Sequence, residues 1–436
     1  MGLRKKFHCV FVGGGPGGTG PLVAALQRGL LPRLLEQRLA VVERGRGLGS
    51  GTLGAYELRS DSMAGAFLEC LEPAPAREVF GALAERPHVQ ELQRLRTTHA
   101  PLRLVARVLD DVGARLQREI EQARGCEVLA RHEACELRAA RDGGWNLSVL
   151  TPEGRVRTLA SRSIVLALGG TQGLEETLTA ELGPGLRLAD RWRERVVLSD
   201  GLFSALGRAR LRAQLAHAGP RARLVVLGGS HSAFSAVWTA LEVASDLLGP
   251  GAITLAHRGR LRVFYPSPAD AAADGYRDFG PTDVCPLTGR VHRLGGLRGD
   301  GRGLARRILG LGGLAPEERV SLRDLDAERD PQRLAALLDE ATCIVAAFGY
   351  RARTLPTWGA DRQRLELGLP LERRLVDDDG RVLDARGAIV PGLFGIGLAS
   401  GCVPRGEQSF RGHTNGVWLY QNDTGERILR GIGVAA

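Results

Sequence analysis

A cluster of glycines near the N-terminus carries the clearest chemical signal in the sequence. It has the spacing G-x-G-x-x-G directly after the apolar run 7–12, and its members are Gly13, Gly15, Pro16 and Gly18. Glycine allows a tight turn here and lets the backbone approach a pyrophosphate, which then meets the positive end of the following helix. The pattern predicts a dinucleotide site, and the alternative is an ordinary glycine turn.

A carboxylate stands where the ribose of such a dinucleotide would lie. Glu43 follows the next apolar run, and a carboxylate at that place can accept hydrogen bonds from an adenosine ribose. The glycine-rich loop 45–54 and the polar stretch 59–62 come next, and their N–H and hydroxyl groups could bind the rest of the cofactor. We therefore predict further cofactor contacts at Arg44, Gly51, Asp61 and Ser62. The alternative is a flexible loop.

A second glycine turn, which matches the G-x-G-x-x-G pattern less well, lies in the middle of the chain. It follows the apolar strand-like run 223–227, and its candidate residues are Gly228, Ser230, His231 and Ser232. Serine is small enough for a phosphate to approach the backbone. The next strand-like run, 252–259, ends in cations such as Arg258 where an acidic residue would favour NADH. Cations there suit a 2′-phosphate, so we predict NADPH, although arginine is abundant throughout the chain.

Alternating strands and helices are needed to position these turns. The order strand, glycine turn, helix, strand occurs twice, and further helical periodicity covers 102–123 and 330–341. This order predicts an α/β fold with two Rossmann-like dinucleotide-binding domains. Two such sites in one chain suggest one tightly held flavin, FAD, and one exchanging nicotinamide. Residues 264–320 show few clear periods, which is typical of a long loop region with a functional surface.

The motifs resemble those of the flavoproteins with two dinucleotide-binding domains. Within that group the chain is most similar to class B flavin monooxygenases, especially the N-hydroxylating enzymes that act on ornithine and lysine. The resemblance rests on the strand-like run 164–170, on residues 347–350 with Phe348 replacing the threonine of an ATGY element, and on the turn 392–397. The cysteine pair of disulfide reductases and the Baeyer–Villiger fingerprint are both missing.

The resemblance implies the order of the domains. The first segment of the FAD-binding domain is expected at residues 1–195, and the NADP-binding domain, with a substrate-side loop region, at 196–340. The C-terminal segment of the FAD-binding domain is expected at 341–436. Gly397 then belongs to a turn against the FAD. Residues 406–416 are dense in hydrogen-bond donors, and we predict that Thr414 and Asn415 lie at a helix N-terminus facing the flavin. A capped surface loop is the alternative.

The expected activity is that of an FAD- and NADPH-dependent monooxygenase. By resemblance, a C4a-peroxyflavin would transfer oxygen to a nucleophilic nitrogen of a small amine or amino-acid-like metabolite, and molecular oxygen would be the co-substrate. The motifs assign no catalytic side chain and no metal site, and they leave the substrate open. Two alternatives share the nucleotide motifs: an NAD(P)H-dependent flavin reductase without productive oxygen transfer, and a non-catalytic protein that kept the fold.

Composition excludes several other classes of protein. The net charge is +10, from 59 Lys+Arg against 49 Asp+Glu, but Lys5 and Lys6 are the only lysines. No lysine is therefore placed for a pyridoxal Schiff base, and no GK[ST] sequence marks a Walker site. The arginines are dispersed, so nucleic-acid binding is not expected. No apolar run is long enough to span a membrane. Seven cysteines without a CxxC pair favour a cytoplasmic protein, and a homo-oligomer is left open.

Overall fold

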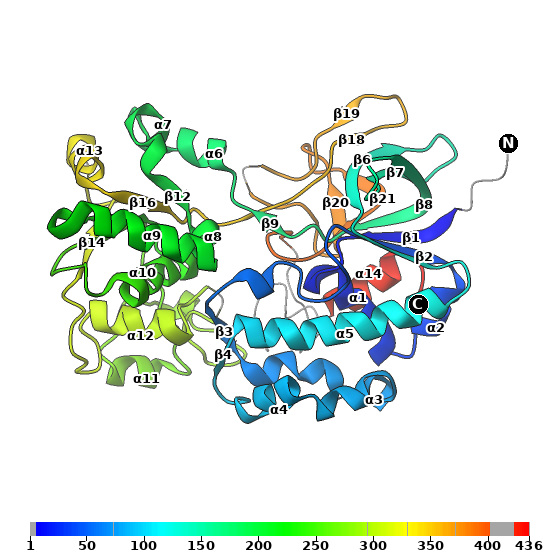
Figure 1. Ribbon diagram of the computed structural model, residues 1–436, viewed down its shortest axis with the longest axis horizontal. Helices are drawn as coiled ribbons and strands as arrows, with labels where there is room; N and C mark the ends of the chain where they lie inside the picture. The colour runs from blue at the N-terminus through cyan, green and yellow to red at the C-terminus, as the bar shows by residue number, and fades with distance from the viewer. Residues whose placement is uncertain are drawn as a thin grey trace.

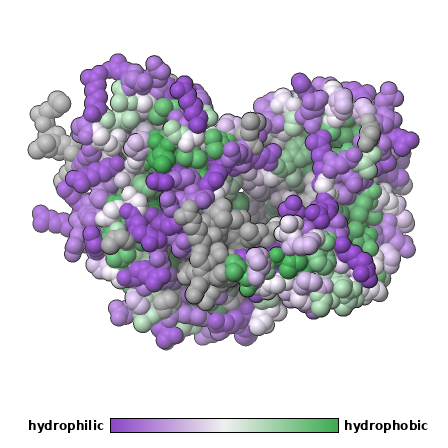
Figure 2. Space-filling view, turned by 180° about the vertical axis from the view of Figure 1, so that it is seen from behind, coloured by the Kyte–Doolittle hydropathy of each residue, from purple (hydrophilic) through white to green (hydrophobic). Residues whose placement is uncertain are grey.

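The computed structural model describes residues 6–72, 74–293, 295–328, 330–370, 372–401 and 423–435. Two lobes, each built on its own sheet, are joined by extended segments (Figure 1). Hydrophilic side chains are spread over both lobes, in keeping with the dispersed charges of the sequence (Figure 2). Within the described ranges, no helix has both the length and the apolar character to cross a membrane.

The first lobe is built on a mixed sheet whose strands come from both ends of the chain. The main path is β19 (Arg364–Leu365), β18 (Thr357–Trp358), β6 (Glu133–Ala139), β7 (Trp145–Leu150), β8 (Val156–Leu166), β1 (Phe7–Val12), β2 (Leu39–Glu43) and β5 (Glu127–Ala130). The strand β21 (Ile389–Gly395) pairs with β8 in parallel and with β20 (Arg381–Leu383) in an antiparallel manner. The hairpin-like tail therefore returns to the N-terminal sheet.

The central strand β1 explains why both faces of this sheet are covered. Alternate side chains of a strand point to opposite faces. Cys9 and Phe11 enter one core beneath the helices, whereas Val10 and Val12 enter the other, on the side of β7 and β8. The helices are α1 (Pro16–Gln27), α2 (Leu31–Glu36), α3 (Ala74–Phe80), α4 (Pro87–Arg94), α5 (Leu102–Gln122) and α14 (Thr424–Gly431).

The long helix α5 confirms the helical periodicity seen at 102–123. Its buried positions recur three or four residues apart and form one apolar stripe, with Leu104, Val105, Val108, Leu109, Val112, Leu116 and Ile120 among them. The opposite face is polar and exposed. Helix α5 packs against α1 and also contacts the loop after Glu43.

The second lobe is a parallel sheet with helices around it. Its strand order is β12 (Val196–Leu198), β16 (Cys343–Ala346), β13 (Leu224–Leu227), β14 (Ile253–His257) and β15 (Val320–Asp324). The helices are α6 (Leu174–Thr179), α7 (Leu188–Arg191), α8 (Ser199–Leu202), α9 (Ala205–Ala218), α10 (His231–Ala244), α11 (Pro268–Ala273), α12 (Gly299–Ile308) and α13 (Pro331–Glu340). The strand β16 pairs with β12 and β13, so this sheet includes a strand beyond residue 340.

The chain crosses between the lobes twice, side by side. The outgoing strand β9 (Gly170–Thr171) pairs in an antiparallel manner with the returning strand β17 (Arg351–Ala352). The first sheet holds strands from both before and after the second lobe, which confirms the predicted α/β fold with one dinucleotide domain inserted in the other. The region 264–320 is less irregular than predicted, because it contains α11 and α12.

Candidate functional site

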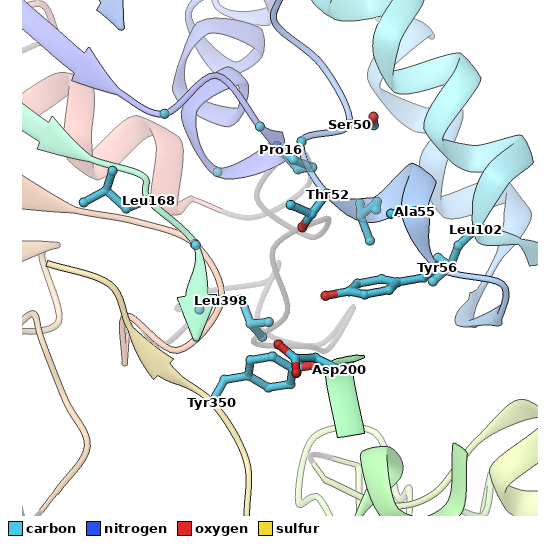
Figure 3. Close-up of a pocket in the computed structure, with 18 of the residues that line it drawn as sticks. Pro16, Ser50, Thr52, Ala55, Tyr56, Leu102, Leu168, Asp200, Tyr350 and Leu398 are labelled. Atoms are coloured by element: carbon cyan, nitrogen blue, oxygen red, sulfur yellow. The ribbon is translucent and has the colours of Figure 1, made fainter. Parts of the chain in front are cut away.

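A large pocket lies between the two lobes, with a volume of about 840 Å³. Both lobes contribute to it: the turn after β1 and the loop after β2 from the first, and the start of α10 from the second. Many predicted site residues line it, namely Gly13, Gly15, Pro16, Glu43, Arg44, Gly51, Asp61, Ser62, His231, Ser232 and Gly397. Figure 3 shows Pro16 and Thr52 on the first-lobe side of this pocket.

The glycines of the first turn are required for different reasons. Gly13 has a φ of +107°, and a Cβ there would lie 2.3 Å from the carbonyl oxygen of Ala167. A Cβ on Gly18 would lie 1.8 Å from the carbonyl oxygen of Gly13, so this glycine allows the helix to pack on the strand and does not itself line the pocket. A Cβ on Gly15 would meet nothing nearer than Gly51 Cα, at 3.5 Å. The protein therefore has room for a Cβ at Gly15, and the open space beside it faces the pocket.

Glu43 is held at the end of β2 by backbone donors. The N–H of Gly14 donates to its Oε2 at 2.6 Å, and the N–H of Gly45 donates to its Oε1. Each carboxylate oxygen can accept more than one hydrogen bond, so acceptor capacity remains for the hydroxyls of a ribose. This arrangement fixes the carboxylate at the pocket edge, next to the first glycine turn.

The glycine-rich loop 45–54 packs against α5. Asp110 of α5 accepts a hydrogen bond from the N–H of Ser50 at 2.8 Å. A Cβ on Gly113 would lie 2.1 Å from the carbonyl oxygen of Leu48, so helix and loop are in direct backbone contact. Gly51, with a φ of +58°, then lies against Gly15 across the pocket wall.

The C-terminal segment meets the first glycine turn. Gly397 has a φ of +113°, and its Cα lies 3.4 Å from a Cβ built on Gly17. The N–H of Ile396 donates to the carbonyl of Leu166, which aligns the two segments. Three parts of the chain that are distant in sequence thus form one wall of the pocket. Thr414 and Asn415 lie outside the described residues, and their predicted contact with the flavin stays a prediction.

The second glycine turn opens α10. Gly228 has a φ of +140°, and a Cβ there would lie 2.6 Å from the carbonyl oxygen of Ala347, so this glycine is needed for strand packing. Ser230 is the N-cap residue of α10, in extended conformation. Neither residue lines the pocket, whereas His231 and Ser232, in the first turn of the helix, do. The positive end of α10 thus faces the cavity, as an anion site requires.

His231 and Asp61 meet across the pocket from the two lobes. His231 Nε2 lies 3.6 Å from Asp61 Oδ2, and Asp61 belongs to β3 (Arg59–Met63), which pairs with β4 (His99–Pro101). Burial lowers the pKa of His231, the charge of Asp61 acts in the opposite direction, and Arg298 adds to the lowering. At neutral pH the imidazole is therefore mainly uncharged and able to accept a proton.

Arg258 lies at the end of β14, as predicted, but it does not line the pocket. Its guanidinium donates to the carbonyl oxygen of Leu182 at 2.6 Å. Nearby, Arg260 pairs with Asp283 at 3.1 Å, and Asp326 accepts a hydrogen bond from the N–H of Gly259 at 2.6 Å. An acidic residue, Asp326, therefore does lie at this edge. It belongs to the segment after β15, and the sequence pattern did not indicate it. The contact of Arg258 with a 2′-phosphate stays a prediction.

A group of polar side chains in the pocket was missed by the sequence reasoning. Figure 3 shows Tyr56 pointing toward Asp200 and Tyr350. Burial and the charge of Asp200 raise the pKa of Tyr56, and burial, Tyr56 and Asp200 raise the pKa of Tyr350. Both phenols therefore remain protonated and can donate hydrogen bonds. Tyr56 follows the loop after β2 and Asp200 lies in α8, so no spacing in the sequence could have linked them.

The donor set of the pocket fits two dinucleotides. It offers two helix N-termini, a carboxylate at the end of β2, and a glycine whose open side faces the cavity. Among the described residues, no group of three or more His, Cys, Asp or Glu side chains is arranged to hold a metal ion. The polar groups of the pocket that could serve chemistry include His231, Asp61, Tyr56, Tyr350 and Asp200.

The chain is similar to known proteins in both sequence and fold. No family model matches the sequence. The chain is 34% identical over 439 residues, 98% of its own length and 97% of the relative's, to CMP-5′-(3-aminopropyl)phosphonate hydroxylase of Streptomyces rubellomurinus.

Solved structures of the same fold include a cadaverine monooxygenase from Erwinia amylovora bound to FAD. Its TM-score is 0.57 at 12% identity, with 99% of this chain and 96% of that chain covered. The ornithine N-hydroxylase of Kutzneria sp. 744, with reduced FAD, NADP+ and L-ornithine, has a TM-score of 0.54 at 17% identity, with 98% and 99% covered.

Proposed function

The chain belongs to the hydroxylase family of the Streptomyces relative, and on this premise we propose that it is an FAD- and NADPH-dependent monooxygenase that hydroxylates the nitrogen of a primary aliphatic amine. The observation that supports the amine most directly is the pair of Asp61 and His231 at the junction of the two nucleotide turns. A carboxylate there can bind an ammonium group, and a neutral imidazole can accept its proton.

The name of the relative supports the substrate class. That protein is a hydroxylase of an aminopropyl phosphonate joined to CMP, which carries a primary amine at the end of a short chain. We carry over to this chain the amine as the reacting group.

The positions of the residues indicate which cofactor each part of the pocket would hold. The turn at Gly13–Gly18, with Glu43 and Gly51, would hold FAD, which when bound supplies the activation of oxygen and the transfer of one oxygen atom. The start of α10 would hold the pyrophosphate of NADPH through the backbone N–H groups of its first turn and through Ser232, whereas the His231 side chain faces Asp61. Tyr56 and Tyr350 would donate hydrogen bonds near the junction of the two cofactors, and the lobes together exclude water from it.

Proton transfer is the step that the side chains themselves perform. An alkylammonium group has no lone pair to attack oxygen, so it must first lose a proton. His231 would accept that proton, and the adjacent Asp61 carboxylate would stabilise the imidazolium that forms. When product leaves, the proton returns to solvent through the open side of the pocket.

The experiment is an assay of the FAD-loaded enzyme with NADPH, oxygen and a panel of primary amines. The panel contains 3-aminopropylphosphonate, its CMP ester, ornithine, lysine and cadaverine. Formation of a hydroxylamine, with NADPH consumed in equal amount, supports the proposal. NADPH oxidation that yields hydrogen peroxide and no hydroxylated product with any amine would favour the flavin reductase alternative.

A further inference from the structure

The pocket continues beyond the reacting end, along one face of α10. His231, Ser235 and Trp238 all line it, and their spacing of four and three residues places them on one side of the helix. At 1.5 Å per residue, Trp238 lies ~10 Å further along the axis than His231. The first turn of α10 suits a cofactor pyrophosphate, so the stretch near Trp238 remains for another part of a ligand.

Another part of the pocket wall comes from the start of α12 and from the chain around β3. Arg298, Asp300 and Gly301 of the second lobe line the pocket together with Leu58 and Arg59 of the first, and α12 packs against β3. A Cβ on Gly301 would lie 3.6 Å from Phe234 Cβ, so the helix approaches α10 closely there. The two lobes thus enclose a compartment between α10, α12 and β3.

Arg298 is the cation of this compartment. Its guanidinium lies 4.3 Å from the ring centre of Phe264, and it donates a hydrogen bond to the carbonyl oxygen of Arg293. Burial lowers its pKa to about 10, Asp61 opposes the shift, and Arg290 and Arg293 add to it. An oxyanion beside Arg298 would stabilise this charge, and the planar guanidinium fork matches a phosphate or phosphonate group.

The carboxyl group of Asp300 lies on the same wall, where it would repel an anion if charged. Burial raises the pKa of Asp300, whereas Arg59 and His99 lower it. The shift means that Asp300 takes up a proton more readily than a free carboxyl group does, which weakens its repulsion of an anion as the pH falls.

Trp238 provides the aromatic surface of the compartment. It is partly buried against the second core, with part of the indole facing the pocket. An indole face stacks on a nucleobase, because both are flat and polarisable. The pocket wall thus offers a guanidinium and an indole, two groups that can bind the phosphate and the base of a nucleotide.

We propose that this compartment is a nucleotide-binding subsite for the substrate, in which Arg298 binds the phosphate or phosphonate and Trp238 stacks on the base. The inference rests on the proposed function, because it assigns the far end of the same amine substrate. The substrate class is then an aminoalkyl phosphonate or phosphate ester of a nucleotide, held with its amine toward Asp61 and His231.

The test is direct binding of CMP to the FAD-loaded enzyme by calorimetry. R298Q should weaken CMP binding about tenfold or more, the loss expected when a charge-assisted hydrogen bond is removed. The matched control is R302Q, which changes the same charge one turn further along α12, where Arg302 stacks on Tyr265 and does not line the pocket. R302Q should stay within about twofold of the parent. W238L should also weaken CMP binding, and W238F should restore part of it.

Each outcome decides the proposal. It is overturned if CMP does not bind, if R298Q and R302Q weaken CMP equally, or if R298Q weakens NADP+ rather than CMP. In the last case Arg298 belongs to the cofactor site. A hydroxylamine from 3-aminopropylphosphonate that forms as efficiently as from its CMP ester would also overturn the subsite, and would leave the proposed amine hydroxylation intact. Equal FAD content and melting temperature in all variants excludes misfolding.

Discussion

Gly15 and Gly18 belong to one turn but differ in what surrounds them. At Gly18 the protein backbone itself leaves no space, whereas at Gly15 the nearest protein atom allows ordinary contact. A requirement for glycine at position 15 must therefore come from the ligand. A substitution at Gly18 should therefore affect folding, whereas a substitution at Gly15 should affect cofactor binding.

We expect G15A to fold and to lose FAD affinity. An added methyl group would occupy the space of the cofactor, and alanine at the N-cap costs only ~1 kcal/mol of stability. FAD affinity, measured by titration of the apoprotein, should fall about tenfold or more, since 1.4 kcal/mol corresponds to tenfold. G18A is the contrast: its Cβ meets backbone at 1.8 Å, so the melting temperature should fall sharply. Unchanged FAD affinity in G15A would contradict the site.

His231 gives a prediction about pH. Its pKa is lowered by burial, and the charged groups that face it are Asp61 and Arg298. As pH falls through this lowered pKa, below the ordinary value of about 6.5, the imidazole becomes charged and can no longer accept a proton. The kcat of the parent should therefore fall on the acid side at that pKa.

In H231Q the acid limb should move to alkaline pH. Without the imidazole, turnover would depend on the free amine, whose own pKa is near ~10, as for lysine. The control is H217Q, since His217 is exposed at the end of α9. A pH profile of kcat that is the same in H231Q and the parent would remove His231 from proton transfer.

The 2′-phosphate assignment has a selective test at Arg258. R258A should raise the KM for NADPH about tenfold and leave the KM for NADH within about twofold, because only NADPH carries the additional phosphate. Steady-state kinetics with both nicotinamides measure this directly. Since Arg258 also bonds the carbonyl of Leu182, an equal loss for both would assign the residue to the structure of that edge.

At the scale of elements, α5 acts as the support of the FAD side. Asp110 bonds the loop 45–54, and Gly113 allows the backbone contact. We expect D110A to reduce stability by ~1 kcal/mol, as for one hydrogen bond, and to weaken FAD several-fold because the loop is released. The control is D111A: the neighbouring carboxylate pairs with His88 at 2.8 Å and does not contact the loop. Chemical denaturation and FAD titration check both; equal effects on FAD would contradict the role of the loop.

Local sequence patterns predicted several helices and strands, whereas a helix that depends on long-range packing was not predicted. The runs at 7–12, 102–123 and 330–341 became β1, α5 and α13, because apolar spacing is a local property. The helix α12 was missed because its sequence GDGRGLARRI is glycine-rich and its apolar face is short. Packing against α10 stabilises it, which no local propensity could indicate.

The same distinction applies to the site. The glycine turns and Glu43 could be predicted, since each depends on a few consecutive residues after a strand. The meeting of His231 with Asp61, and of Tyr56 with Asp200 and Tyr350, depends on how two lobes close on each other. Such contacts have no signature in spacing along the chain.

At the scale of the whole molecule, the insertion of one dinucleotide domain in another creates the pocket. The chain crosses at β9 and β17, and the first glycine turn and the first turn of α10 both line the same cavity, one from each lobe. Neither lobe alone contains both Asp61 and His231. The chemistry proposed for the amine is therefore a property of the assembled pair of lobes.

The most direct test of amine hydroxylation is the fate of oxygen when the FAD-loaded enzyme turns over NADPH with the CMP ester of 3-aminopropylphosphonate. With isotope-labelled oxygen gas, we predict one labelled atom in a hydroxylamine product for each NADPH consumed. Labelled oxygen recovered only as hydrogen peroxide, with the amine unchanged across the panel of amines, would contradict the proposed function.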